Sequence, residues 1–220
     1  MAEERALKRL GILLSGRGSN FIAIAEAIRR HRLQGAEIAV VLSNKEDAAG
    51  LKAAREMGLA AFVVPSAGRK RVEHDAEMIA RLHQHKVDLV CLAGYMRILS
   101  PEFVRAFPNR ILNVHPSLLP SFPGLDAQAQ ALEYGARVAG CTVHFVDEAV
   151  DHGAIVVQRT VPVLDEDTAE SLSARILEQE HIAYPEAIAR VLSGAFHLSG
   201  RRYTRRSNGG MRQGPRDLSV

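Results

Sequence analysis

The chain has 220 residues, of which 47% are hydrophobic and 24% are charged. These proportions are typical of a globular domain with a substantial core, and they exclude wholesale disorder. The formal net charge is +3, but six arginines and one aspartate fall within residues 195–220, which leaves 22 basic and 24 acidic residues in 1–194 and a balance of −2. The basic character therefore belongs to the C-terminal segment, and it does not indicate nucleic-acid binding by the rest of the chain.

Cysteine usage and hydropathy point away from secretion and from membranes. Cys91 and Cys141 form no CxxC pair and each lies within an apolar run, so we expect both to be buried and reduced. No apolar stretch approaches the roughly 18–20 residues that span a bilayer. The apolar run at 10–14 is too short for the core of a signal peptide. We therefore expect a soluble, cytoplasmic protein that contacts no membrane.

In the first half of the chain, short apolar runs alternate with segments of helical periodicity. Strands are predicted at 10–14, 38–42, 61–64, 89–93 and 111–114. Helices are predicted around 21–28, 48–57 and 71–85, and from Ser100 and Pro101 onward, where proline suits the first helical position. This alternation is typical of βαβ units and of a parallel sheet.

The second half departs from this alternation. A helix is predicted at 127–134, and the strands at 142–146 and 155–162 are separated by a segment with no helical repeat, so we expect them to pair antiparallel. A last helix is predicted from Asp167 towards residue 192, with Glu170 in a capping box and a bend or break at Pro185. The sequence thus predicts an α/β fold with a mostly parallel central sheet, antiparallel strands at one side and helices on both faces.

Residues 198–220 lack periodicity and are rich in Gly, Arg and Ser. This composition predicts a solvated, flexible tail, with binding of RNA or another polyanion as the alternative. We therefore expect a single domain over 1–194, followed by a basic, flexible tail over 195–220.

The loop after the first predicted strand reads Ser-Gly-Arg-Gly-Ser-Asn at 15–20. Glycines let backbone N–H groups turn towards a ligand, and the N-terminus of the following helix adds about half a positive charge, which suits a phosphate. Phe21 stands where a dinucleotide fingerprint has its third glycine, and Ser-Asn-Lys at 43–45 replaces the acidic ribose ligand. The loop is therefore either a phosphate cradle or a plain turn in which Ser19 or Asn20 caps the helix.

A second candidate site begins at the end of the strand predicted at 111–114. Asn113 and His115 are two residues apart, so their side chains share a face of the strand. In an open α/β sheet, ligands bind at the carboxyl ends of the strands. The prolines at 116, 120 and 123 stiffen the loop that follows. We interpret this segment as the mouth of a site; the alternative is that both are ordinary polar residues at a strand end.

The turn between the two late strands contains Asp147, Glu148, Asp151 and His152. A turn rich in Asp and Gly requires no function. The alternative is that one of its carboxylates reaches His115, where a carboxylate beside the imidazole would favour the protonated ring.

These three segments, in this order and spacing, closely resemble the phosphoribosylglycinamide formyltransferases (glycinamide ribonucleotide transformylases), a family of folate-dependent enzymes of purine synthesis. The resemblance extends from about residue 10 to residue 194 and includes Leu-Ala-Gly-Tyr-Met-Arg-Ile-Leu-Ser-Pro at 92–101. The string Asn-x-His-Pro-Ser-Leu-Leu-Pro at 113–120 is specific to folate formyltransferases as a group. The Gly-x-Gly-Ser-Asn loop at 16–20 narrows the resemblance to this family. It implies a Rossmann-like formyltransferase fold.

The resemblance also implies a reaction and a set of site residues. The family transfers a formyl group from 10-formyltetrahydrofolate, a co-substrate, to the amine of 5-phosphoribosylglycinamide. The positions that match catalytic residues are Asn113, His115 and Asp151. Those that match phosphoribosylglycinamide contacts are Gly18, Ser19, Asn20 and Glu180. Those that match folate contacts are Arg71, Met96, Arg97, Ile98, Leu99, Asn113, Asp147, Glu148, Ala149, Val150 and Asp151.

These residue types fit the transfer. Asn113 and a protonated His115 can donate to the oxyanion that forms on the formyl group, while Asp151 keeps the ring charged and oriented. The proton that moves from the attacking nitrogen to the leaving nitrogen passes through His115 or a water. No metal is expected, because the histidines form no HExxH motif and His83 and His85 point to different faces of a helix. The expected partners are small molecules and not nucleic acid, and the expected state is a monomer or a homodimer.

Two departures from the family pattern bear on the site. Leu-Asp-Ala-Gln at 125–128 stands where some members carry histidines, and His152 stands before Gly153 where a second glycine is usual.

Other functions are less consistent with the sequence. Methionyl-tRNA formyltransferases carry a further C-terminal barrel domain, whereas 26 residues follow residue 194 here. Formyltetrahydrofolate hydrolases carry a regulatory domain before the catalytic one. We expect neither of these activities. A non-catalytic phosphate- or nucleic-acid-binding module is disfavoured because Asn113, His115 and Asp151 are present together.

Overall fold

The structure is a computed structural model that describes residues 6–206. Its first half contains β1 (Lys8–Leu14), α1 (Ser19–Arg29), β2 (Ala36–Ser43), α2 (Ala49–Glu56), β3 (Ala61–Val63), α3 (Arg71–Gln84), β4 (Leu89–Leu92), α4 (Pro101–Ala106) and β5 (Ile111–His115). Its second half contains α5 (Ala127–Tyr134), β6 (Val138–Phe145), β7 (Ile155–Pro162), α6 (Ala169–Leu192), β8 (Phe196–Ser199) and β9 (Arg202–Arg205). Each predicted element up to residue 192 is present, although β6 begins at Val138 rather than at residue 142.

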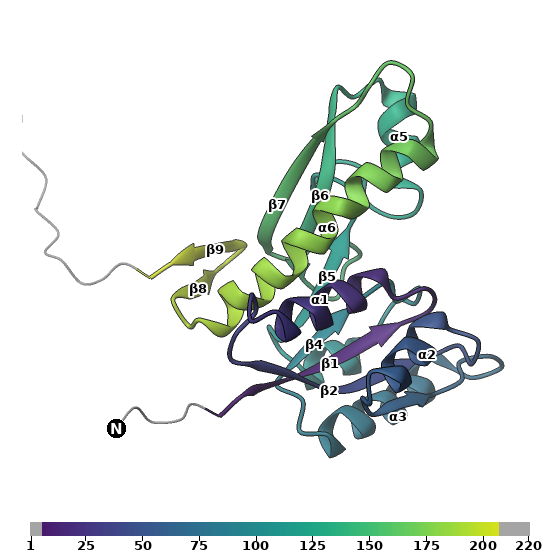
Figure 1. The fold of residues 1–220 in the computed structure, drawn as a ribbon, viewed down its shortest axis with the longest axis vertical. Helices are drawn as coiled ribbons and strands as arrows, with labels where there is room; N and C mark the ends of the chain where they lie inside the picture. The colour runs from purple at the N-terminus through teal and green to yellow at the C-terminus, as the bar shows by residue number, and fades with distance from the viewer. Residues whose placement is uncertain (1–5, 207–220) are drawn as a thin grey trace, which may run out of the picture.

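The strands form one nine-stranded sheet in the order β3-β2-β1-β4-β5-β6-β7-β9-β8 (Figure 1). Strands β1 to β5 pair parallel, while β6 runs antiparallel to both β5 and β7. This arrangement confirms the predicted α/β class, with a mostly parallel sheet and antiparallel strands at one side.

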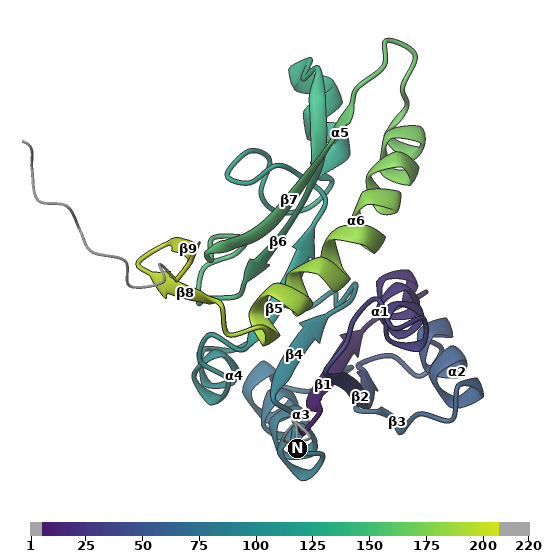
Figure 2. The same ribbon diagram turned by 60° about the vertical axis from the view of Figure 1, so that its left-hand side comes forward.

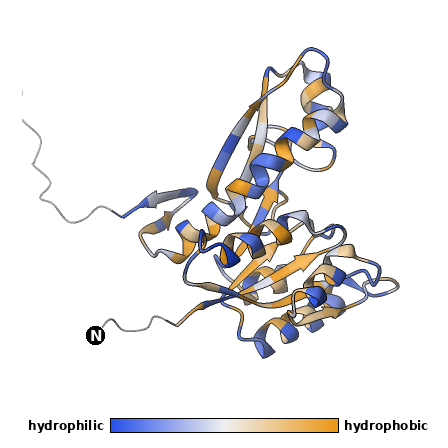
Figure 3. Ribbon diagram, in the orientation of Figure 1, coloured by the Kyte–Doolittle hydropathy of each residue, from blue (hydrophilic) through white to orange (hydrophobic). Residues whose placement is uncertain are grey.

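The core lies on both faces of the sheet. Along β1, Leu10, Ile12 and Leu14 pack into one hydrophobic cluster and Leu13 into the other, as the alternation of a strand requires. The first cluster contains buried residues of α1, α2 and α6, and the second contains buried residues of α3 and α4. Helices therefore cover both faces (Figure 2), and the parallel strands between them are largely hydrophobic (Figure 3).

Helix α6 runs along the sheet from the α5 end to the C-terminal hairpin (Figure 1). The expected capping box with Glu170 is wrong, because the cap is Thr168, which exchanges hydrogen bonds with Ser171. Of the bend or break expected at Pro185, the break is wrong, because the helix continues through this residue. Burial of this helix compensates for the missing N–H of proline, since its Tyr184 is fully buried and donates to the carbonyl oxygens of Leu92 (3.0 Å) and Leu112 (2.9 Å). Within residues 6–206, no helix combines the length and the hydropathy that crossing a bilayer requires.

The C-terminal segment differs from the expected flexible tail. Strands β8 and β9 form an antiparallel hairpin, and β9 pairs with the start of β7 through Arg202 and Ile155. The sequence feature that indicates this hairpin is the glycine at its turn. The pairing of Ser199 with Arg202 leaves a two-residue turn that begins at Gly200, whose φ is +57°. The expectation of a flexible tail is thus wrong for Phe196–Arg205, and over 207–220 it lies outside the described residues.

Candidate functional site

Three of the candidate segments meet at one edge of the parallel sheet. Strand β1 lies between β2 and β4, so the chain reverses its direction of winding at this point. Ligands of open α/β sheets bind outside the carboxyl ends of the strands at such a switch point. The segments that leave β1, β4 and β5 there are 15–18, 93–100 and 116–124.

The loop after β1 leaves the N-terminus of α1 open. Gly18 is the residue before the helix, with a φ of +73°, and no side chain caps the helix. A Cβ on Gly18 would lie 2.9 Å from Cα of Gly50 at the start of α2, so the close approach of this loop to α2 requires glycine. The interpretation of Ser19 or Asn20 as a helix cap is therefore wrong. The unpaired N–H groups of the first turn suit an anion.

Asn20 is turned to α6 instead. Its Nδ2 donates to Oε2 of Glu180 over 2.7 Å, which joins residues 160 positions apart. Glu180 is 8% exposed, and burial raises the pKa of its carboxyl while the Asn20 hydrogen bond lowers it. The Oδ1 atom of Asn20 is buried and has no hydrogen-bond partner among the described residues. This pair therefore offers acceptors to a ligand that carries hydroxyl donors.

His115 and Asp151 meet although they come from different segments. Nδ1 of His115 lies 3.3 Å from Oδ2 of Asp151, and Nε2 lies 2.8 Å from the carbonyl oxygen of Phe122. Both ring nitrogens thus face acceptors, and the ring satisfies both only when each nitrogen carries a proton. Asp151 has a φ of +51°, and its carboxylate also accepts from the N–H of Gly124 over 2.8 Å.

A second histidine, which the sequence analysis missed, joins this group. His144 pairs in register with Asn113, and its Nε2 lies 3.3 Å from Nδ2 of Asn113 and 3.8 Å from Oδ1 of Asp151. Burial lowers the pKa of His144, although the hydrogen bond to the carbonyl oxygen of Phe145 opposes the shift. The signal for it was the alternation of Thr142 and His144 with apolar neighbours along the strand.

Apart from Asn113 on β5, the candidate folate-contacting residues occupy two loops and one helix end. Met96 is 69% exposed, Ile98 is 56% exposed and Val150 is 54% exposed, whereas Leu99 is buried. Exposed apolar side chains on neighbouring loops are suited to cover a flat ring. Arg71 begins α3 with an exposed side chain, and within the described residues it makes no hydrogen bond to the other candidates. The structure thus brings Asn113, His115 and Asp151 together, and pairs Asn20 with Glu180 separately.

The loops that leave β1 and β4 are tied to each other. Oγ of Ser15 donates to Oδ1 of Asn44 over 2.6 Å and accepts from the N–H of Met96 over 2.8 Å. Asn44 and Arg97 also line a hollow of about 400 Å³ beside these loops. Ser15 and Asn44 were not predicted as site residues, and a polar residue at the end of each buried strand was the available signal.

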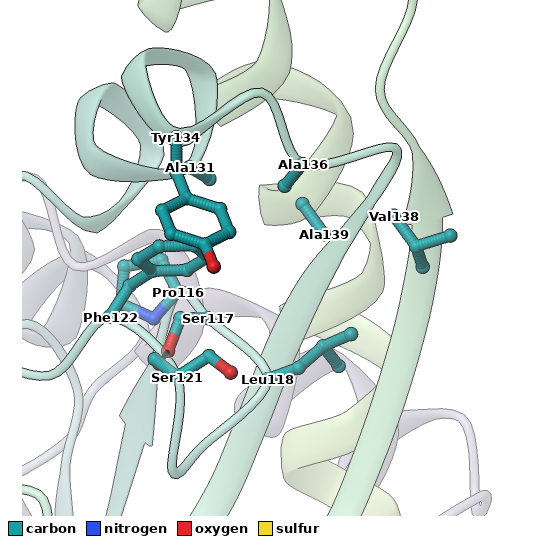
Figure 4. A pocket seen from close by; sticks show the side chains of 10 residues that line it. All are labelled: Pro116, Ser117, Leu118, Ser121, Phe122, Ala131, Tyr134, Ala136, Val138 and Ala139. Atoms are coloured by element: carbon teal, nitrogen blue, oxygen red, sulfur yellow. Dashed lines mark hydrogen bonds between the residues drawn. The ribbon is translucent and has the colours of Figure 1, made fainter.

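A second hollow, of about 200 Å³, lies behind the loop that follows His115 (Figure 4). Phe122 and Tyr134 line it together with Leu118, but Asn113, His115 and Asp151 do not. Within residues 6–206, no group of three or more His, Cys, Asp or Glu side chains is placed to hold a metal ion.

Comparison with known proteins agrees with this geometry. Residues 8–188 match the family model described as "Formyl transferase". The chain belongs to the formyl transferase family. Within that family, phosphoribosylglycinamide formyltransferase of Escherichia coli is 43% identical over 188 residues, which cover 85% of this chain and 88% of that protein.

Two further relatives bear on the same point. A crystal structure of glycinamide ribonucleotide transformylase 1 from Symbiobacterium toebii superposes with a TM-score of 0.88 at 50% identity, covering 90% of this chain and 94% of that one. The trifunctional purine biosynthetic protein adenosine-3 of Drosophila melanogaster is 47% identical over 195 residues, or 87% of this chain. The chain spans only 14% of the length of that trifunctional protein.

Proposed function

We propose that this chain transfers the formyl group of 10-formyltetrahydrofolate to the amine of 5-phosphoribosylglycinamide, a step of purine synthesis. The proposal is supported by the 43% identity to the E. coli phosphoribosylglycinamide formyltransferase. The observation that carries it is the cluster of Asn113, His144, Asp151 and His115, together with the uncapped N-terminus of α1. In this cluster Asn113 is hydrogen-bonded to His144, and both histidine rings lie within 3.8 Å of the Asp151 carboxylate. The cluster supplies an amide donor and a charged ring for an oxyanion, and the helix supplies a site for the substrate phosphate.

The phosphoribosyl end of the substrate binds at α1 and α6. Backbone N–H groups of Gly18, Ser19 and Asn20 bind the phosphate, with the helix dipole favouring its charge. Glu180 and Oδ1 of Asn20 accept from the ribose hydroxyls, which gives the buried, unpartnered oxygen a donor.

The folate co-substrate binds over the two loops with exposed apolar side chains. Met96, Ile98 and Val150 contact the ring system, and Arg71 and Arg97 offer positive charge to the carboxylates of the folate. The remaining candidate folate contacts in the two loops are Leu99, Asp147, Glu148 and Ala149. In this arrangement the formyl group is presented towards Asn113 and His115.

The transfer forms one C–N bond and breaks another. The substrate amine attacks the formyl carbon, and the carbonyl oxygen becomes an oxyanion that accepts from the free amide N–H of Asn113 and is stabilised by the protonated ring of His115. Asp151 holds that ring in place. The intermediate then collapses with cleavage of the bond to the folate nitrogen, which takes up the proton that the attacking nitrogen releases, through His115 or a water.

The test is the dependence of the reaction on the amine. The purified protein is incubated with 10-formyltetrahydrofolate, with and without phosphoribosylglycinamide, and formation of tetrahydrofolate is followed by absorbance. Formation that requires the amine supports transfer. Formation at the same rate without it contradicts the proposal and indicates a hydrolase.

The proposal extends to the partners, the location and the oligomeric state of the enzyme. We infer that its partners are these two small molecules, that it acts in the cytoplasm as a monomer or a homodimer, and that residues 1–194 form the catalytic domain. Gel filtration with light scattering tests the oligomeric state.

A further inference from the structure

The C-terminal hairpin contacts the loop at 146–154, which carries Asp151, and the two strands that flank this loop. Tyr203 packs edge-to-face on Phe145 at the end of β6, with ring centroids 5.2 Å apart. Arg202 pairs with Ile155 at the start of β7. Arg201, in the turn of the hairpin, reaches His152 in the loop itself. The hairpin therefore touches both strands that flank the loop as well as the loop.

The contact at His152 has a defined chemistry. Nδ1 of His152 lies 2.9 Å from Oδ2 of Asp147, so this nitrogen carries the proton and donates to the carboxylate. Nε2 of the same ring is then an acceptor, and Nη1 of Arg201 donates to it. Asp147, His152 and Arg201 thus form a chain of hydrogen bonds that closes the loop on itself and joins it to the hairpin.

The loop has little freedom elsewhere. A Cβ on Gly153 would lie 1.7 Å from the carbonyl oxygen of Phe145, so the backbone after His152 is packed directly against β6. Asp151, between the packed residue and the exposed tip of the loop, has a φ of +51°. A non-glycine residue whose backbone is held at a positive φ requires support from its surroundings.

The hairpin itself is anchored on α6. The rings of Phe196 and Tyr203 stack with centroids 5.4 Å apart, and the guanidinium of Arg190 lies 5.9 Å from the centre of the Phe196 ring. The family match ends at residue 188, before the hairpin begins. The support for the loop therefore comes from a segment outside the matched domain.

We propose that Arg201 is a positioning residue: through His152 it holds the loop at 146–154 in the conformation that places Asp151 against His115. The proposal rests on the proposed function for its kinetic consequence, but not for its structural one. Arg201 touches neither substrate. Its loss loosens the loop over the folate, whereas the phosphoribosyl site at α1 and α6 is unaffected.

The experiment compares Arg201→Ala and His152→Ala, alone and combined, with Arg205→Ala as a control that removes an exposed arginine from the same hairpin. Hydrogen exchange measures the protection of the amides at 147–153, and steady-state kinetics gives kcat and the KM of each substrate. Arg201→Lys, which keeps a donor, is the rescue variant.

In Arg201→Ala we expect faster exchange in this loop alone and a rise of about two- to fivefold in the KM for 10-formyltetrahydrofolate, the range for one exposed polar contact. The KM for phosphoribosylglycinamide and the melting temperature stay unchanged. The double variant is no worse than His152→Ala alone, because loss of the His152 ring already removes the contact that Arg201 makes. Arg201→Lys restores part of the protection.

Unchanged exchange of the loop in Arg201→Ala, or equal effects in Arg205→Ala, overturns the proposal. A fall in melting temperature with equal changes in both KM values also overturns it, because that pattern indicates a general structural role. If the wild-type protein forms no tetrahydrofolate, the proposed function fails, and the exchange measurement alone decides the role of Arg201.

Discussion

The amide nitrogen of Asn113 lies 3.3 Å from Nε2 of His144 on the adjacent antiparallel strand. Nδ1 of His144 donates to the carbonyl oxygen of Phe145 over 2.7 Å, and burial lowers the pKa of the ring, so that Nε2 is an acceptor at neutral pH. One amide N–H of Asn113 is therefore committed to His144, which leaves the other available to a ligand. His144 thus fixes the orientation of the Asn113 amide.

His144→Phe tests that orientation, because it keeps an aromatic ring at this position but removes Nε2, the atom that accepts from Asn113. We expect kcat to fall about tenfold, less than the hundredfold or more that follows deletion of an oxyanion donor. The KM for phosphoribosylglycinamide stays within twofold. Steady-state kinetics measures both, and a kcat equal to that of the wild type would show that Asn113 needs no such partner.

The same histidine gives the fold a pH dependence. Because its pKa is lower in the folded protein than the value of about 6.5 in an unfolded chain, the unfolded state binds more protons as the pH falls below 6.5. The free energy of unfolding therefore decreases in that range, and above it this group has no effect. Urea titrations between pH 5 and pH 8 should show a smaller decrease in His144→Phe. An identical slope in both proteins would contradict this assignment.

The pair of His115 and Asp151 should carry most of the rate. We expect His115→Ala and Asp151→Asn each to lower kcat by about 10²–10³-fold, since each disturbs the charged ring that, in the proposed mechanism, stabilises the oxyanion. Both variants should still bind phosphoribosylglycinamide, because the phosphate site at α1 is intact; calorimetry measures this binding. A near-wild-type rate for Asp151→Asn at pH 7 would refute the pairing argument.

Glu180→Gln should separate stability from function. The raised pKa of Glu180 means that the folded protein holds this proton more tightly, so stability falls as the pH rises above about 4.3, the unfolded value. Glutamine removes the buried charge and retains an acceptor for Asn20. We expect a higher melting temperature at pH 8, little change at pH 4.5, and a raised KM for phosphoribosylglycinamide. A lower melting temperature at pH 8 would contradict the assignment.

Gly153→Ala should destabilise the fold by about 1–3 kcal/mol, because the new methyl group would collide with the carbonyl oxygen of Phe145. Gly16→Ala is the matched control, since nothing lies within 4 Å of a Cβ there. Urea unfolding measures both variants. Equal stabilities would show that the loop at 146–154 relaxes freely.

Much of the fold was predictable because its signals are local. Buried strands such as β1 and β4 read as apolar runs, and the alternation with helices fixed the parallel half of the sheet. The hairpin was missed because its strands have only four residues each and because it opens the arginine-rich C-terminal segment. The glycine in its turn, Gly200, indicated the hairpin more strongly than its short strands did.

The site was predictable only where neighbours in sequence act together. Asn113 and His115 lie on one strand, so their shared face follows from the period of two. The contact of Asn20 with Glu180 joins the two ends of the domain, and the contact of Asn113 with His144 depends on strand register. Neither contact can be inferred from the sequence alone, and Glu180 was predicted as a site residue only because of the resemblance to a known family.

Helix α6 carries Glu180 against Asn20 of α1, Tyr184 against the carbonyl oxygens of β4 and β5, and Arg190 under the hairpin. A slip of one turn along its axis would move each of these residues by about 5.4 Å. The hydroxyl of Tyr184 admits no such slip, because both of its carbonyl partners belong to central strands of the sheet. A single phenol group thus holds the axial register that keeps the pair of Asn20 and Glu180 at a constant separation from the distant C-terminal strands.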